Sequence, residues 1–387
     1  MIYLDNHATT ACDPRVLEAM WPWFAMHTGN AHSVEHASGR AAAASVEAAR
    51  ADVAALIGAA PNEIIFTSGA TEANNLAIKG AARFAGPAGR PGLITAATEH
   101  KCVLESVRDM AAEGFRAVVL PVQPDGALAL PVLRAALSAP TLLVSVMGAN
   151  NETGFLQDIA AIAAAAHEGG ARFHTDLAQA AGRVPIDVRA QDIDLASISA
   201  HKLHGPQGIG ALFVRRHPRM RLAPLFSGGG QERGLRSGTL PVPLIVGFGA
   251  ACRIAAAEMQ AEQTRIGALR DRLLAGLRAQ IPGLVVNGPL QRRLAGNLSL
   301  QFPGIDAIAL IDACPELAIS TGSACGSAEV APSYVLTALG LTQAQAASTL
   351  RVGIGRFTSA IDIDAAIGIL ARAATKLAAV PTLIAET

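Results

Sequence analysis

Residues 142–176 read LLVSVMGANNETGFLQDIAAIAAAAHEGGARFHTD, and this stretch decides the fold. The apolar run 142–147 predicts a buried strand, 158–167 predicts a helix that ends before Gly169, and 172–175 predicts a second strand. Short strands that are apolar throughout, separated by helices, are typical of a mostly parallel sheet covered on both faces. The stretch therefore predicts the α/β class.

The same alternation extends over the first two-thirds of the chain. It predicts further strands at 63–67, 92–96, 115–121, 195–199 and 209–214, and one more helix at 72–83. We expect these elements to form one central sheet with helices on both faces.

The pattern changes after about residue 259. The amphipathic stretch 258–280 predicts a connecting helix, and short strands follow at 284–286 and 297–302. We therefore expect a large α/β domain at 12–259. A smaller α+β domain is expected to combine 1–11 with 260–387 and to carry the Gly/Ser/Cys loop 321–327.

Polar residues gather where the predicted strands end. In open α/β sheets, ligands bind outside the carboxyl ends of the strands. One site is therefore expected from Thr71, His100, Asn151, Asp176, Ser199, His201 and Lys202.

Composition narrows the class of partner and compartment. Lys+Arg and Asp+Glu both number 31, so the net charge of zero gives no electrostatic case for nucleic acid or an anionic membrane. No apolar run reaches the length of a membrane span, and MIYLDNHATT has no basic signal-peptide region. The five cysteines form no CxxC pair, which argues against a zinc site or disulfide framework and for a reducing cytoplasm.

Lys202 and Asp176 are the strongest candidates for chemistry. A lysine near a strand end is usually exposed, but Lys202 follows Ser199 and His201 and precedes Gly205-Pro206, which predicts a tight loop around a site. A desolvated lysine can form a Schiff base with an aldehyde. Asp176 alone reads as an ordinary helix cap. Together with Gln179 it is instead suited to the ring nitrogen and phenolic oxygen of pyridoxal phosphate.

Four other features can be interpreted either as functional or as ordinary structural ones. Residues 68–71 (SGAT) could bind a phosphate at a helix start or be a plain cap. His100 could move protons or simply pack, and Arg351 could bind a carboxylate or form a structural ion pair. Cys325 could be a small buried residue, but its Gly/Ser/Ala surroundings favour an accessible nucleophilic thiol.

The motifs LDNHATT, FTSGATEANNLAIKG, ATEHK, NNETG, HTDLAQAAG, SAHKLHGPQGIGAL, GGGQERGLRSGT, GSAC and LRVGIGRFT occur in this order from residue 2 to about 360. The chain thereby resembles the group I cysteine desulfurases of the NifS and IscS type, in the class-V aminotransferase family. The resemblance implies a fold-type-I pyridoxal-phosphate transferase that works as a homodimer.

The resemblance also implies a role for each site residue. Lys202 would bond the cofactor aldehyde, Asp176 the pyridinium nitrogen and Gln179 the phenolic oxygen, while His100 would stack on the ring. The phosphate would be held by Ala70, Thr71, Ser199 and His201, with Thr239 supplied by the other subunit. The substrate side would consist of Asn151, which would contact cofactor or substrate, Arg351 on the substrate carboxylate, and Cys325 as the nucleophile that forms the persulfide.

The implied reaction converts L-cysteine to L-alanine. Lys202 or His100 would shuttle protons, and the persulfide on Cys325 would pass to a protein acceptor, either an iron–sulfur scaffold or another thiol carrier. Two other enzymes of the same fold stay open, a selenocysteine lyase and an aminotransferase. A catalytically silent partner that only binds a sulfur acceptor is the third alternative. An aminotransferase has no use for a thiol at Cys325, and a silent partner has no need of Lys202 and Asp176.

Overall fold

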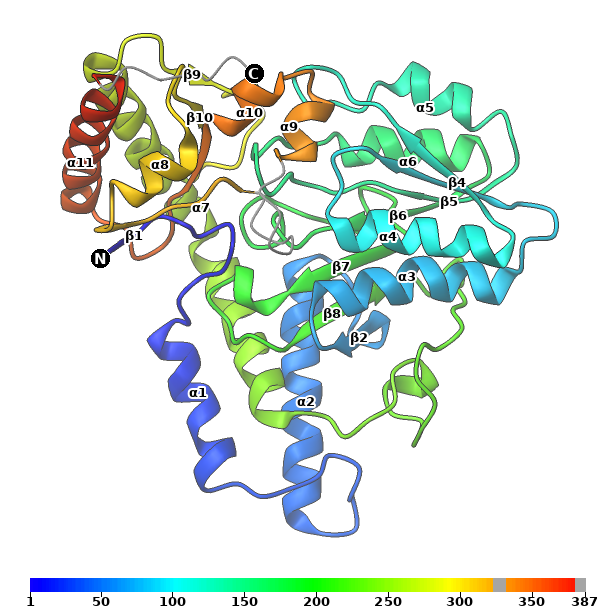
Figure 1. Cartoon of the computed structure of the whole chain (residues 1–387). Helices are drawn as coiled ribbons and strands as arrows, with labels where there is room; N and C mark the ends of the chain where they lie inside the picture. Colours follow the sequence, from blue (N-terminus) through cyan, green and yellow to red (C-terminus); the bar gives the residue numbers. More distant parts are fainter. Residues whose placement is uncertain (323–331, 380–387) are drawn as a thin grey trace.

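A seven-stranded sheet forms the centre of the larger part of the molecule (Figure 1). The structure is a computed structural model that describes residues 1–322 and 332–379. In sheet order the strands are β2 (Ile64–Thr67), β8 (Gly210–Val214), β7 (Leu195–Ser199), β6 (Arg172–Asp176), β5 (Thr141–Ser145), β3 (Gly92–Ala96) and β4 (Arg116–Leu120). β8 runs antiparallel to both neighbours and the other pairs are parallel, which confirms the mostly parallel sheet.

Successive side chains of each strand enter different hydrophobic cores, because strand residues alternate between the two faces of a sheet. Ile65 joins the core under α3 (Ala70–Ala85) and α4 (Lys101–Asp109). Ile64 joins the core on the opposite face. That core includes side chains of α2 (Ala37–Leu56), α5 (Leu130–Ala136), α6 (Ile159–Glu168) and the first part of α7 (Val242–Gln280). Helices on both faces are confirmed.

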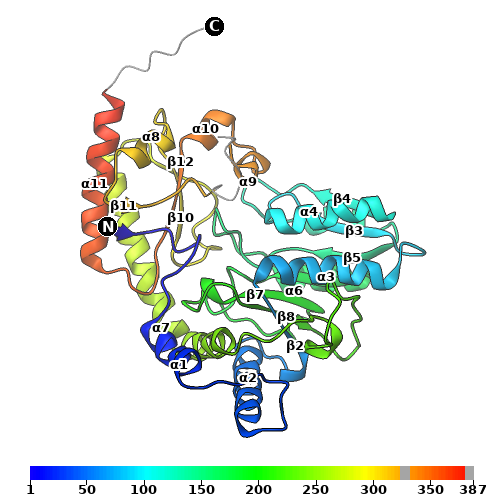
Figure 2. The same ribbon diagram turned by 60° about the horizontal axis from the view of Figure 1, so that its bottom comes forward.

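Helix α7 is longer than the sequence pattern predicts. It begins at Val242 rather than at residue 258, and it packs along α2 and α1 (Pro14–Ala25) (Figure 2). Pro241 and Pro243 lie at its start, where no intrahelical N–H is lost. Gly249 allows the close approach to α2, since a Cβ there would lie 2.7 Å from the Cα of Ala49.

By length and composition, α7 is the one helix of the described residues that could cross a membrane, although half of its most apolar window is buried inside the molecule. Phe248 and Ile245 are completely buried in the core under the sheet. We therefore interpret α7 as a core helix.

A smaller lobe lies at the other end of α7 (Figure 2). Its antiparallel sheet has the order β12 (Thr349–Gly353), β10 (Asn297–Gln301) and β9 (Val285–Val286), and β1 (Ile2–Tyr3) pairs in parallel with β11 (Leu317–Ala318). The helices of this lobe are α8 (Ala307–Asp312), α9 (Tyr334–Ala338), α10 (Gln343–Ala347) and α11 (Ala360–Ala378). Its core contains Leu4 and the α7 side chains from Ile266 onward, while α7 residues up to Cys252 belong to the core under the large sheet. The expected boundary at residue 259 falls between these two groups of α7 residues, and the two-domain division stays a prediction.

Candidate active site

A cavity of about 620 Å³ opens at the carboxyl ends of β5, β6 and β7 and reaches β12 of the smaller lobe. It is large enough for a cofactor and a small substrate. Its lining includes the predicted site residues Ala70, Thr71, His100, Asn151, Asp176, Gln179, Ser199, His201, Lys202 and Arg351.

Two predicted residues do not line this cavity in the described part of the chain. Thr239 is exposed on the segment between η4 (Glu232–Gly234) and α7. Cys325 lies outside the described residues. Gly322, the last described residue before it, does line the cavity.

Lys202 ends the short 3₁₀ helix η3 (Ala200–Lys202), which follows β7 directly. Its ammonium donates hydrogen bonds of 2.5 Å to the carbonyl oxygens of His7 and Ala8. The N-terminal segment thus reaches across from the smaller lobe to the lysine. This contact places a primary amine at the edge of the cavity with backbone oxygens as partners.

Asp176 ends β6, and both of its carboxylate oxygens accept hydrogen bonds. Oδ1 accepts from the backbone N–H of Ala178 at 2.8 Å, and Oδ2 accepts from Nδ2 of Asn74 at 2.7 Å. Asn74 has no exposed surface and comes from α3. Beside Asp176, burial raises the pKa of Glu99 well above its usual value, and the Asp176 charge adds to the effect. The neutral form of Glu99 is thereby favoured next to this carboxylate.

His100 caps α4, and this contact determines its tautomer. Its Nδ1 accepts the backbone N–H of Cys102 at 3.2 Å and lies 3.0 Å from the Cys102 sulfur. A backbone N–H can only donate, so the neutral imidazole carries its proton on Nε2. The Cys102 sulfur also accepts from Asn74 at 3.2 Å. Asn74 and Cys102 therefore connect the Asp176 carboxylate to the His100 ring.

The start of α3 is suited to bind an anion. Gly69 precedes the helix and no side chain caps it, and the first N–H groups of a helix have no partner inside it. Gly210 of β8 packs against this turn, since a Cβ there would lie 2.7 Å from the Cα of Gly69. Burial and the charge of Lys202 lower the pKa of neighbouring His201 to about 4, so its ring is neutral at physiological pH.

Arg351 lies on β12 and faces the cavity from the smaller lobe. Its guanidinium forms a salt bridge of 2.7 Å with Asp5 and donates to the Asn151 carbonyl at 3.0 Å. Two buried polar atoms here, the Arg351 Nε and the Asn151 Oδ1, have no hydrogen-bond partner among the described residues. Buried polar atoms are rarely left unpaired, so this corner fits a polar ligand.

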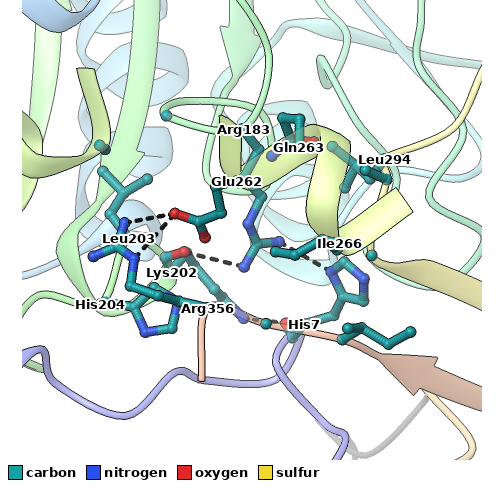
Figure 3. Close-up of a pocket in the computed structure, with 16 residues that line it drawn as sticks. His7, Arg183, Lys202, Leu203, His204, Glu262, Gln263, Ile266, Leu294 and Arg356 are labelled. Carbon is teal, nitrogen blue, oxygen red and sulfur yellow. Dashed lines mark hydrogen bonds and ion pairs between the residues drawn. The ribbon is translucent and has the colours of Figure 1, made fainter. Parts of the chain in front are cut away.

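A layer of polar side chains lies directly behind Lys202 (Figure 3). Arg183 is at its centre and donates to Oε1 of Gln179 at 2.7 Å and to the carbonyl oxygens of Asn6 and Lys202, both at 3.0 Å. Burial lowers the pKa of Arg183 to about 10. Burial and the nearby Arg183 charge lower the pKa of His7 well below its usual value.

Sequence reasoning missed His7, Asn74, Cys102 and Arg183. His7 belongs to the motif LDNHATT, which was a usable signal, and Cys102 follows the motif residue His100 by two positions. Nothing in the local sequence indicates that Asn74 and Asp176, which are 102 residues apart, form a hydrogen bond. In the described part of the chain, no group of three or more His, Cys, Asp or Glu side chains is arranged to hold a metal ion.

Comparison with known proteins agrees with this geometry. The family described as aminotransferase class-V matches residues 2–366. Cysteine desulfurase IscS of Rickettsia bellii (strain OSU 85-389) is 50% identical over 97% of this chain and 92% of its own length. A solved structure titled NifS-like protein superposes with a TM-score of 0.89 at 34% identity, covering 97% of this chain and 99% of its own.

Another solved structure, titled SspA in complex with cysteine, has a TM-score of 0.81 at 36% identity and covers 93% of this chain and 100% of its own. Both the sequence relative and the two structures match nearly the full length of this protein. The chain belongs to the class-V aminotransferase family, among the cysteine desulfurases of the IscS and NifS type.

Proposed function

We propose that this protein takes the sulfur from L-cysteine, releases L-alanine, and carries the sulfur as a persulfide on Cys325. The observation that carries the proposal is that Lys202, Asp176 and Gln179 line one cavity at the carboxyl edge of the sheet, together with the uncapped start of α3. The enzymes of this family use pyridoxal phosphate, and the IscS relative supports cysteine as the substrate.

The residues of the cavity fit pyridoxal phosphate. Lys202 supplies a primary amine for the cofactor aldehyde, and Asp176 supplies a carboxylate for the ring nitrogen. We assign the phosphate to the start of α3 (Ala70 and Thr71), Ser199 and His201, and the phenolic oxygen to Gln179. When bound, pyridoxal phosphate withdraws electrons from the substrate's α-carbon and so weakens the bonds around it.

The substrate corner is assigned to Arg351 and Asn151. A guanidinium binds a carboxylate through paired hydrogen bonds, and the Arg351 Nε, which has no partner in the described part of the chain, supports this role. The Asn151 Oδ1, to which no described residue donates, is an acceptor for a substrate or cofactor N–H or O–H group. Asp5 holds the guanidinium at this corner through its salt bridge.

Proton movement is assigned to Lys202 and His100. The Nζ of Lys202 donates to two backbone carbonyls, which hold this amine at the edge of the cavity. In its neutral form the His100 ring carries its proton on Nε2, because Nδ1 accepts from the backbone N–H of Cys102. The two residues are therefore suited to give and take protons at the substrate's carbon atoms.

Sulfur transfer is assigned to Cys325, which lies outside the described residues. Its thiolate attacks the sulfur of the substrate, so that a sulfur–sulfur bond forms and the carbon–sulfur bond breaks. The electron pair of the broken bond stays with the three-carbon product, which gains a proton and leaves as alanine. Cysteine and a protein thiol thus give alanine and a protein persulfide, with atoms and electrons balanced.

The proposal also covers the oligomeric state of the protein and the acceptor that receives the sulfur. We expect a cytoplasmic homodimer in which Thr239 of the partner subunit adds to the phosphate site. The exposed position of Thr239, away from its own chain's cavity, supports a contribution to a second subunit. The acceptor is expected to be an iron–sulfur scaffold or another protein thiol.

The test is an assay of alanine and sulfide from L-cysteine in the presence of a thiol reductant. The holoenzyme is expected to make both products, and Cys325→Ser is expected to make neither while still binding pyridoxal phosphate. Cys12→Ser is the matched control, since Cys12 does not line the cavity. Normal sulfide production by Cys325→Ser would overturn the persulfide assignment.

A further inference from the structure

We propose that Arg183 is a positioning residue that sets the orientation of the Gln179 amide and holds the Lys202 turn against the N-terminal segment. Arg183 does not line the main cavity but a small pocket of about 30 Å³ behind Lys202 (Figure 3). The inference rests on the proposed function, because Gln179 and Lys202 are assigned to the cofactor there.

The Gln179 amide is fixed from both sides. Its Oε1 accepts from Nη1 of Arg183 at 2.7 Å, and its Nε2 donates to the carbonyl oxygen of His7 at 2.8 Å. A guanidinium can only donate and a carbonyl can only accept. A flipped amide would set its NH₂ group against the guanidinium and its oxygen against the carbonyl. Arg183 therefore makes Gln179 present its N–H side, which is the side that a phenolic oxygen requires.

The second terminal nitrogen of Arg183 holds two segments of backbone. Nη2 donates to the carbonyl oxygens of Asn6 and Lys202, both at 3.0 Å. Asn6 belongs to the N-terminal segment, whose next two carbonyls accept from the Lys202 ammonium. One guanidinium thus joins the backbone of Lys202 to the segment that contacts its side chain. A lysine lacks the planar fork needed to make these bonds together.

His7 completes the arrangement without adding charge. Its Nδ1 lies 3.0 Å from Nη1 of Arg183 and 3.2 Å from Oε1 of Gln179. As an acceptor it takes a proton of the guanidinium, and as a donor it bonds the amide oxygen, so either tautomer agrees with the amide oxygen facing Arg183. The lowered pKa of His7 keeps its ring neutral beside the guanidinium. Across the small pocket, Glu262 forms a salt bridge of 3.0 Å with Arg356. Within the described residues no carboxylate pairs with Arg183, so its charge is directed at the Gln179 amide and at backbone oxygens.

The test compares the absorption spectrum of the holoenzyme in Arg183→Lys, Gln179→Ala and the double variant. Arg183→Lys is expected to shift the absorption of the bound cofactor in the same direction as Gln179→Ala. It is also expected to lower kcat roughly tenfold, the effect of losing one hydrogen bond to a charged group, with KM for cysteine unchanged. In the double variant the spectral shift is expected to equal that of Gln179→Ala alone, because Arg183 acts on the phenolic contact only through that amide, while a further loss of kcat reflects the lost bonds of Nη2 to the Asn6 and Lys202 carbonyls.

The matched control is Arg189→Lys, because Arg189 is an exposed arginine that follows Arg183 closely in the sequence. If Gln179→Ala leaves the spectrum unchanged, the proposed role of Gln179 is wrong. If Gln179→Ala shifts the spectrum and Arg183→Lys does not, the role of Arg183 is overturned while the proposed function stands. Arg183→Gln serves the same comparison if the lysine variant does not fold, and thermal melting of all variants separates loss of stability from the spectral effect.

Discussion

The side-chain amide of Asn74 donates a 2.7 Å hydrogen bond to the Asp176 carboxylate from a position with no exposed surface. The amide nitrogen also reaches the sulfur of Cys102, which lies 3.0 Å from Nδ1 of His100. The acid assigned to the cofactor ring and the histidine assigned to proton movement thus share one hydrogen-bonded chain. A change at Asn74 is therefore expected to affect both.

Replacing Asn74 by alanine removes a donor from the ionised Asp176 side chain. We expect pyridoxal phosphate to bind roughly tenfold more weakly, the size expected for one hydrogen bond to a charged group. Asn74→Asp is expected to be worse, because two facing carboxylates cannot easily both be ionised. The measurement is fluorescence titration of the cofactor-free protein, with exposed Asn62→Ala as control. Unchanged affinity in both Asn74 variants would rule out this role.

Lys202→Ala removes the amine from the cavity and its two bonds to the backbone of His7 and Ala8. We expect the variant to lose the yellow colour of the holoenzyme and all desulfurase activity. Circular dichroism should show an unchanged fold, because the rest of η3 is retained. A yellow variant with the same absorption maximum as the natural protein would show that another residue bonds the cofactor.

Arg351→Ala removes the guanidinium assigned to the substrate carboxylate. We expect KM for L-cysteine to rise by about tenfold to hundredfold, which corresponds to the hydrogen bonds of a charged pair. The control is Arg272→Ala, whose ion pair with Asp364 is exposed and lies between α7 and α11. Steady-state kinetics measures both. Equal KM values for Arg351→Ala and the control would remove Arg351 from the substrate site.

His167 gives a prediction about stability and pH. Its hydrogen bond of 2.7 Å to buried Asp194 raises its pKa above the ordinary value of 6.5. The folded protein therefore binds this proton more tightly than the unfolded chain does. The contribution to stability is fully present below pH 6.5 and is lost as the pH rises through the raised pKa.

We expect His167→Gln to lower the free energy of unfolding by on the order of 1 kcal/mol at acidic pH and by less at alkaline pH. Urea unfolding at the two pH values measures the difference. A larger loss at alkaline pH would reverse the sign and contradict the assigned ion pair.

The strands of the sheet could be predicted from the sequence, because each strand is a short local run that can be recognised by itself. The runs 92–96 (GLITA) and 195–199 (LASIS) are short, carry no charge and are bounded by polar or turn residues, and the structure has fully buried strands with these bounds. The predicted start of α7 at residue 258 was wrong, because only the amphipathic part of the helix was recognised, and the buried apolar part from Val242 has no such pattern.

The second layer of the site could not be predicted in the same way. Arg183 contacts Asn6 and His7 across more than 170 positions of sequence. Such contacts depend on where the N-terminal segment lies relative to the large sheet, and no local sequence pattern predicts this. The cavity-lining residues were accessible to sequence reasoning because the ends of parallel strands share one edge. Their chemical roles stay predictions until variants are measured.

The most direct test of the central claim is to locate the sulfur after a single turnover. Holoenzyme is mixed with one equivalent of L-cysteine without reductant, and the alkylated protein is digested and mapped by mass spectrometry. We expect one equivalent of alanine, and one extra sulfur atom on the peptide that contains Cys325. Alanine formation with the extra sulfur on another cysteine, or with none on the protein, would contradict the account.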